Sequence, residues 1–404
     1  MTRPHPALRR ARLAVVGMFV VNGATYNSVV PRLPTLRDEL GLSNAALGTA
    51  IAAFPAAALV FGVLAGPLIA RVGSGRAGAG IGLLGAVLLP AVAAAPSWAA
   101  LAGALFVLGL TDAWADAAMN AHGLRVQEGY GRSIVNGLHA VWSMAAVGAG
   151  LLGAAAAGLA VPLPVHLGTV AVVLVVVSLV AWRWALPGPE PGPEPGPAEG
   201  GRERAGHGPL RAVLVAAGPL LALAGLLVAS GGIEDSASSW GALYVRDDLG
   251  GGPFVAGLPF VAFQTAMTLG RLAGDRVVDR YGPVAVARSG AALAVVAMTT
   301  ALAVAHPVAA VLGFAMTGLG VSTLFPLGFA AAGRVPGVRP GDGIAVVGWL
   351  ARLGFLTFPP IIGTVADRVS VGAGLVLVPV AGLAALALAG ALRPRAGAPR
   401  TLRS

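Results

Sequence analysis

Acidic and amide side chains recur at helical spacing inside an apolar stretch of the chain. Asp112, Asp116 and Asn120 stand four residues apart, so on a helix each is rotated by only about 40° from the last and the three form one stripe. A charge at membrane depth persists where it lines a water-filled cavity or finds a partner. The stripe therefore predicts proton or substrate chemistry, with a structural acid bonded to a neighbouring helix as the alternative for Asp116.

Further ionisable residues lie in two other apolar stretches. Glu234 and Asp235 are adjacent, hence about 100° apart around a helix, so both cannot point at the same ligand, and Glu234 is the candidate. Arg352 cannot shed its charge, so it needs an anionic substrate or an anionic partner, for which Asp112, Asp116 and Glu234 are the candidates.

Amide, imidazole and aromatic groups add candidates for substrate contact. Asn22 and Tyr26 are one helical turn apart, with Asn27 beside them, and either bind a substrate or fasten two helices together. His139 is either a proton relay or a satisfied polar contact. The other candidates are Asn120, Trp142, Trp240, Gln264 and Trp349.

The composition places these groups in a membrane protein. Of the 404 residues 56% are hydrophobic and 11% are charged, and the mean hydropathy is +0.81, which leaves too little polar surface for a soluble globule. The net charge of +10 comes from scattered arginines, which argues against nucleic acid as a partner. Without cysteine the chain has no disulfide or thiolate metal site, and no nucleotide loop or catalytic motif of soluble enzymes is present. We therefore predict a protein that is not an enzyme and needs no cofactor or metal.

Twelve segments are long and apolar enough to cross a bilayer, which takes about 20 residues. We predict spans at 13–33, 44–69, 77–95, 98–121, 135–158, 165–186, 211–243, 254–275, 284–305, 308–331, 343–366 and 372–392. The Pro- and Gly-rich stretch 187–209 is a solvated linker, so the chain divides into a six-helix bundle over 1–186 and a second over 210–404.

The arginines predict the orientation. All 27 Lys and Arg residues are Arg, which, with abundant Ala and Gly, is typical of a bacterial protein. If the N-terminus is inside, the outer segments hold only Arg32, Arg37, Arg246 and Arg368. This bias predicts a multi-pass protein of the bacterial plasma membrane with both termini and the linker in the cytoplasm. The basic, then apolar, start resembles a signal peptide, but we interpret it as the first span because no clear cleavage site follows.

Ionisable groups are unevenly distributed among the spans. The third, sixth and twelfth spans have none at their centres, and Arg288 in the ninth lies near one end. These four spans are predicted to face lipid, while the other eight surround a path.

The two halves repeat a short motif after their second spans. GPLIARVG at 66–73 and DRVVDRYG at 275–282 resemble the G-x-x-x-D-R-x-G signature of the major facilitator superfamily. Ala70 replaces the acid of the motif in the first copy, and Asp275 replaces the leading glycine in the second. The resemblance implies an inner gate formed by Gly66, Arg71, Gly73, Arg271, Asp275, Asp279, Arg280 and Gly282.

Within that superfamily the chain is most similar to the fucose-permease-like branch and its uncharacterised bacterial relatives. The similar segments are DAAMN (116–120), HAVWS (139–143), EDSASSW (234–240), GRLAG (270–274), GLGVSTLFPL (318–327) and the proline pair at 359–360. The resemblance implies an all-α membrane fold of twelve helices in two pseudo-symmetric bundles, with proton coupling at Asp116. The first helix departs from the branch, because amides and Tyr26 replace its acid.

These observations predict a secondary active transporter that works by alternating access as a monomer. Its partners are a small, sugar-like solute, membrane lipids, and protons that are exchanged at Asp116, Asp112 and Glu234. The alternatives are a proton-driven exporter of drug-like or secondary-metabolite molecules, a transporter-like membrane sensor, and a membrane enzyme acting on lipid.

Overall fold

The structure is a computed structural model that describes residues 6–131, 133–188 and 217–393. The described chain is helical, with no strand among these residues. It contains twelve helical segments long and apolar enough to cross a membrane, which confirms the predicted all-α fold and the number of spans. Most of the predicted linker, from residue 189 onward, lies outside the described residues.

The first six spans come from the N-terminal half. Span 1 is broken into α1 (Pro6–Thr25), η1 (Tyr26–Ser28), η2 (Val30–Arg32) and α2 (Leu33–Glu39). Span 2 consists of α3 (Asn44–Phe61), η3 (Gly62–Leu64) and α4 (Ala65–Val72). The next four are α5 (Ser74–Ala93), α6 (Trp98–Tyr130), α7 (Val135–Gly158) and α8 (Leu163–Trp184).

The C-terminal half follows the same order. Span 7 is α10 (Ala217–Leu243) with the π-helical turn η4 (Tyr244–Asp248), and spans 8 and 9 are α11 (Pro253–Tyr281) and α12 (Pro283–Val304). Span 10 is broken into α13 (Pro307–Val321) and α14 (Leu324–Ala332), and span 11 is α15 (Pro340–Arg368). Span 12 consists of α16 (Val371–Leu375), α17 (Leu377–Leu388) and η5 (Ala389–Leu392). The predicted spans agree with most of these helices, but span 1 extends further at both ends, and α6, α11 and span 7 extend further at their C-terminal ends. The predicted start of span 7, at residue 211, lies outside the described residues.

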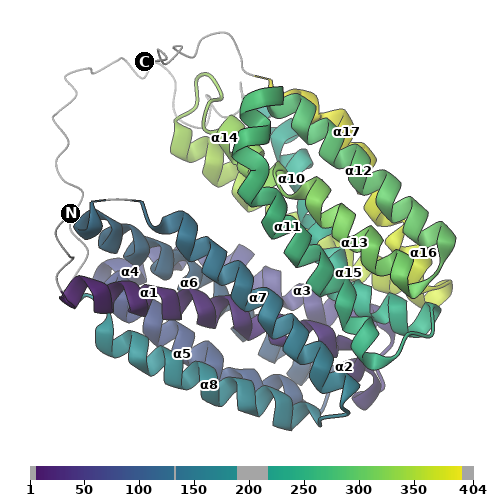
Figure 1. Ribbon diagram of the computed structural model, residues 1–404, viewed down its shortest axis with the longest axis horizontal. Helices are drawn as coiled ribbons and strands as arrows, with labels where there is room; N and C mark the ends of the chain where they lie inside the picture. Colours follow the sequence, from purple (N-terminus) through teal and green to yellow (C-terminus); the bar gives the residue numbers. More distant parts are fainter. Residues whose placement is uncertain (1–5, 132, 189–216, 394–404) are drawn as a thin grey trace.

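The two bundles touch at one end and diverge at the other (Figure 1). We call the end where α8 finishes and α10 begins the linker end, and the opposite end the joined end. At the joined end α3 crosses α15 so closely that a Cβ on Gly48 would meet the carbonyl oxygen of Pro359, and one on Gly363 would meet that of Asn44. On the other flank α7 meets α11, where Gly257 packs on Ala154. Small residues at these crossings let the backbones approach.

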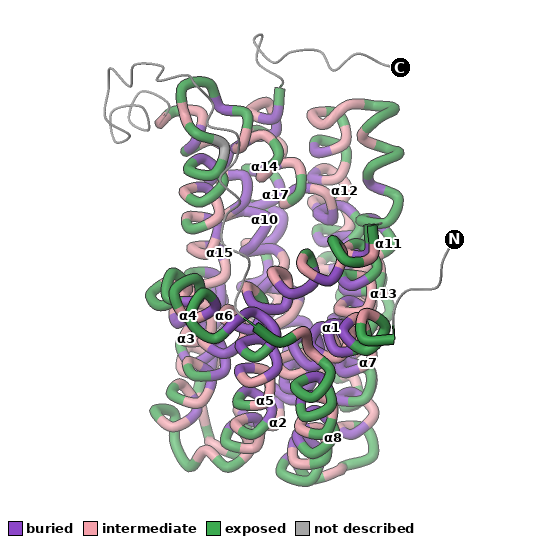
Figure 2. The backbone as a smooth tube through the Cα atoms, turned by 90° about the vertical axis from the view of Figure 1, so that its left-hand side faces the viewer, coloured by how far each residue is buried: buried purple, intermediate pink, exposed green. Residues whose placement is uncertain are grey.

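Burial follows the expected layering of the bundles. Much of α1 and α10, the first helices of the two halves, is buried, whereas α8 shows many exposed residues (Figure 2). The exposed side chains of α8 include Val165, Val172, Val173, Val176 and Leu179. Such an apolar outer stripe suits contact with lipid tails.

Candidate functional site

A polar cavity of about 280 Å³ lies between the two halves. It is lined from the N-terminal half by η1 and by α1, α3, α6 and α7, and from the C-terminal half by α10, α11 and α15. The lining residues include Asn22, Tyr26, Asn27, Phe54, Asp112, Trp142, Glu234, Asp235, Ser238, Gln264, Arg352 and Phe355. None of the lining comes from α5, α8, α12 or α17, the helices of the spans predicted to face lipid.

Three helices of the N-terminal half are tied together by a chain of hydrogen bonds at the cavity. The indole Nε1 of Trp142 on α7 donates to Oδ1 of Asn22 on α1 at 2.7 Å. The Nδ2 of Asn22 in turn donates to Oδ1 of Asp112 on α6 at 2.9 Å. Asn22 therefore links α1 to α6 and α7, which is one of the two roles predicted for it from the sequence. It also orients the side chains of Trp142 and Asp112, which border the cavity.

The first span is irregular where it reaches the cavity. The α-helical hydrogen bonding stops at Thr25, and Tyr26 begins a 3₁₀ turn. The Tyr26 hydroxyl lies close to Asp112 of α6 and to Asp235 and Ser239 of α10. Non-helical backbone at membrane depth is tolerated where it is buried in protein or lines a cavity, so the break marks the site.

Both acids of α10 line the cavity, although only Glu234 was predicted as a candidate for the site. The carboxylate of Glu234 lies 3.9 Å from the guanidinium of Arg271 on α11. Asp235 is buried and accepts a hydrogen bond from Ser239 at 3.3 Å through Oδ1, while its Oδ2 has no hydrogen-bond partner. The two carboxylates reach different parts of one cavity because they leave the helix in different directions.

Arg352 and Asp116 lie at the wall of the cleft between the bundles. Arg352 lines the cavity from α15, and no carboxylate in the described chain forms an ion pair with it. Asp116, one turn beyond Asp112, is exposed and accepts a hydrogen bond from Asn120 at 3.1 Å on its own helix. His139 and Arg352 are its neighbours on α7 and α15. Arg352 therefore faces both the cavity and the exposed acid.

A second cavity of about 380 Å³ lies between α7, α11 and α14. Its lining includes His139, Ser143, Thr268, Arg271 and Asp275, and Trp142 lines both cavities. His139 and Trp142 of the predicted central site thus line the same cavity as Arg271 and Asp275 of the predicted inner gate.

The major facilitator superfamily model matches residues 15–244 and 229–404 of the sequence. The chain belongs to the Major Facilitator Superfamily. This confirms the resemblance noted in the sequence, and members of the superfamily are transporters rather than enzymes.

Known proteins resemble the chain over nearly its whole length. An uncharacterized MFS-type transporter of Yersinia pestis is 29% identical over 353 residues, which cover 86% of this chain and 87% of the relative. The crystal structure of the nucleoside transporter NupG has a TM-score of 0.68 at 14% identity and covers 96% of this chain and 98% of that one. The crystal structure of the transporter FucP in the outward conformation has a TM-score of 0.62 at 16% identity, and the match covers 94% of this chain and 98% of that one. At such identities the solved structures establish a shared fold.

The superfamily motif has the same backbone geometry in both halves. Gly73 between α4 and α5 has φ 84°, and Gly282 between α11 and α12 has φ 81°, the left-handed region that favours glycine. Arg71 and the acidic and basic residues Asp279 and Arg280 of the second copy are exposed at the linker end, as is Gly66. Arg271 and Asp275 line the second cavity.

Two predicted tryptophans lie away from both cavities. Trp240 is 0% exposed, packed in the hydrophobic core, so its role in the predicted substrate site is corrected to one in packing. Trp349 is 46% exposed and donates a hydrogen bond from Nε1 to the carbonyl oxygen of Leu59 across the two halves, at 3.3 Å. Helical periodicity alone could not separate these aromatic residues from Trp142, because it does not show which face of a helix packs against its neighbours.

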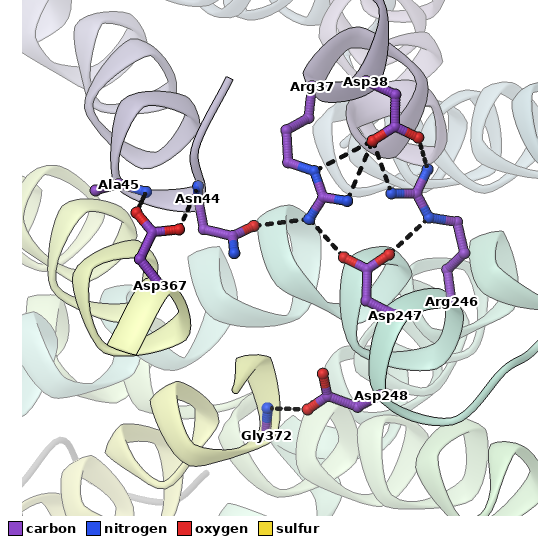
Figure 3. Close-up of polar contacts among 9 residues, drawn as sticks. All are labelled: Arg37, Asp38, Asn44, Ala45, Arg246, Asp247, Asp248, Asp367 and Gly372. Atoms are coloured by element: carbon purple, nitrogen blue, oxygen red, sulfur yellow. Dashed lines mark hydrogen bonds and ion pairs between the residues drawn. The ribbon is translucent and has the colours of Figure 1, made fainter. Parts of the chain in front are cut away.

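The joined end has a cluster of charged side chains that was not predicted from the sequence. Arg37 bonds to Asp247, and Arg246 donates to Asp38 at 2.8 and 3.2 Å (Figure 3). Each of the two aspartates also forms an ion pair with the arginine that directly precedes it in the sequence. We call Arg37, Asp38, Arg246 and Asp247 the clasp. It links the end of span 1 to the end of span 7.

The clasp is encoded by an internal repeat. The pentapeptide RDELG at 37–41 recurs as RDDLG at 246–250, at equivalent places in the two halves. Gly41 and Gly250 share left-handed φ values of 59° and 65°. Nearby, the Asp367 carboxylate of α15 accepts from the backbone nitrogens of Asn44 and Ala45 at 2.7 and 2.9 Å, at the N-terminus of α3 (Figure 3). Charge and helix-end contacts thus hold the joined end closed.

Proposed function

We propose that the chain is a secondary active transporter that carries a small polar solute through the membrane by alternating access, coupled to protons. The observation that carries the proposal is a polar cavity enclosed by helices of both halves, which are closed against each other at one end only. Two matched bundles that rock about such a cavity would expose it to each side in turn.

The lining favours a polar, sugar-like solute over a drug-like one. Amide groups of Asn22, Asn27 and Gln264 and the hydroxyl of Ser238 offer hydrogen bonds. The rings of Tyr26 and Trp142 offer flat apolar surfaces beside them. A site built from buried hydrogen-bonding groups discriminates against ligands that leave those groups unpaired, so the exporter of apolar molecules is the weaker candidate.

Proton coupling is assigned to Asp116, with Asp112 and Glu234 as the further acids. Asp116 is exposed and has Arg352 and His139 as neighbours on two other helices. Protonation of Asp116 removes its attraction for Arg352 on the opposite half, so the proton changes the interaction between the bundles. A ligand shifts a conformational equilibrium through this kind of differential interaction.

The arginine distribution supports an inward-facing assignment of this conformation. The clasp arginines and Arg368 lie at the joined end, whereas Arg9, Arg10, Arg71, Arg125 and Arg280 lie at the end where α8 finishes and α10 begins. The rule that cytoplasmic segments carry the basic residues then places the linker end in the cytoplasm of a bacterial cell.

Single-cysteine labelling tests alternating access directly, because the chain contains no cysteine of its own. Ala58→Cys and Ser238→Cys place probes in the cavity, one in each half, and Leu159→Cys at the exposed end of α7 is the control. A transporter gives labelling of both cavity probes by a membrane-impermeant maleimide from either side, faster from the linker side. Labelling from one side only, as in a sensor with a fixed exposure, contradicts the proposal.

A further inference from the structure

The central cavity is lined by more acidic than basic side chains. Three carboxylates line it, those of Asp112, Glu234 and Asp235, against the single guanidinium of Arg352. Arg271 lies near Glu234, and Arg352 is a neighbour of Asp116. Asp112 is bonded to an amide and Asp235 to a hydroxyl, so in the described chain neither has a basic partner.

These two acids belong to opposite halves and line the same cavity as Tyr26. Asp112 comes from α6 and Asp235 from α10, and both lie close to the hydroxyl of Tyr26. A buried carboxylate without a cationic partner is costly in a medium of low dielectric constant. A positively charged group placed beside Tyr26 would be attracted by both acids at once.

Two unpaired polar atoms define the hydrogen bonds that a ligand must supply. Oδ2 of Asp235 is an acceptor without a donor, and Nε2 of Gln264 is a donor without an acceptor. The residues are only 8% and 4% exposed, and both line the cavity. Since buried polar groups are normally paired, a ligand toward which these two side chains turn would donate to Asp235 and accept from Gln264.

We propose that the transported solute is a small polyhydroxylated amine whose ammonium group binds Asp235, with Asp112 adding a second negative charge across the cavity. This inference rests on the proposed transport function and names its substrate class. A hydroxyl oxygen of the solute accepts from Gln264, and Trp142 covers an apolar face of its ring. The volume of about 280 Å³ is near the lower limit for ligand pockets, which suits a solute of one ring.

Matched ligands separate the contribution of the amine from that of the hydroxyl groups. Binding to the purified full chain is measured by thermal shift and calorimetry with glucosamine, galactosamine and mannosamine, each beside its parent sugar and its N-acetyl derivative. At least one amine is expected to bind about tenfold more tightly than both neutral counterparts, the size of one hydrogen bond to a charged group.

Two variants locate the effect. Asp235→Asn is expected to abolish the preference for the amine, while Asp342→Asn, an exposed acid at the start of α15, keeps it. Gln264→Leu is expected to weaken the binding of the amine and of its parent sugar equally, so the ratio of their affinities stays unchanged. An amine that binds no better than its neutral counterparts, a series in which no amine binds, or a preference that survives Asp235→Asn overturns the inference. Cysteine labelling at Ala58 and Ser238 does not depend on the ligand, so a failure of the transport function would show separately.

Discussion

At the scale of single residues, Asp116 differs from the acids of the cavity because it is exposed and has Arg352 and His139 as neighbours on two other helices. Asp116→Asn keeps its shape and its contact with Asn120 but removes the exchangeable proton. We expect uptake driven by a pH gradient in proteoliposomes to fall to background, while exchange of labelled for unlabelled solute at equal pH persists. Asp342→Asn is the matched control. Gradient-driven uptake that survives Asp116→Asn would remove this residue from the coupling.

The residue scale is also where sequence and structure differ most. The spacing of Asp112, Asp116 and Asn120 identified one face of α6, but Asp112 turns out to line the central cavity while Asp116 does not. The sequence predicted Glu234 rather than Asp235 as a residue of the site, although both line the cavity. Adjacent residues on a helix point in different directions, so their roles depend on where neighbouring helices pack, and a single sequence does not contain that information.

At the scale of elements, the clasp couples the ends of spans 1 and 7 through partly exposed ion pairs, each worth about 0.2–1 kcal/mol. Arg37→Asp replaces the attraction to Asp247 by repulsion, so we expect the joined end to open more often. Faster labelling of Ala58→Cys from that side measures this change. The double variant Arg37→Asp with Asp247→Arg restores the pair and should restore slow labelling. If the single and double variants are labelled equally fast, the pairing does not hold this end closed.

The crossing of α3 and α15 depends on the absence of a side chain. A Cβ at Gly48 would meet the backbone of Pro359, whereas Gly62, near the end of the same helix, has nothing within 4 Å. Gly48→Leu is expected to keep the joined end apart and to reduce transport by more than about tenfold, since a well-packed interface tolerates added volume poorly. Gly62→Leu should transport normally. Equal transport by both variants would show that the close crossing is not needed.

The elements themselves were predictable because lipid imposes strong constraints. A spanning segment must satisfy its backbone hydrogen bonds internally, so length and apolarity identified all twelve spans. The breaks at Tyr26 and Ser322 were not predicted, although Pro31 and Pro326 follow them closely and each lacks the backbone N–H that would continue the helix. The clasp was missed, although its repeated pentapeptides could have been found by comparing the two halves of the sequence.

At the scale of the whole molecule, sequence predicted two matched bundles but not which end would be closed. That choice depends on many weak contacts between the halves, such as the clasp, the contact of Asp367 with α3 and the crossing at Gly48. None of them is strong alone. A structure held by several such contacts changes conformation readily, which a transporter requires.

Distances between spin labels at the two ends test this account most directly. In the cysteine-free chain, one label pair on Val72 and Tyr281 spans the linker end, and another on Leu159 and Val369 spans the joined end, all at exposed positions. Breaking the clasp with Arg37→Asp, or adding a transported solute, should lengthen distances at the joined end and shorten them at the linker end. Distances that stay fixed at both ends, or that change in the same sense, contradict alternating access in this protein.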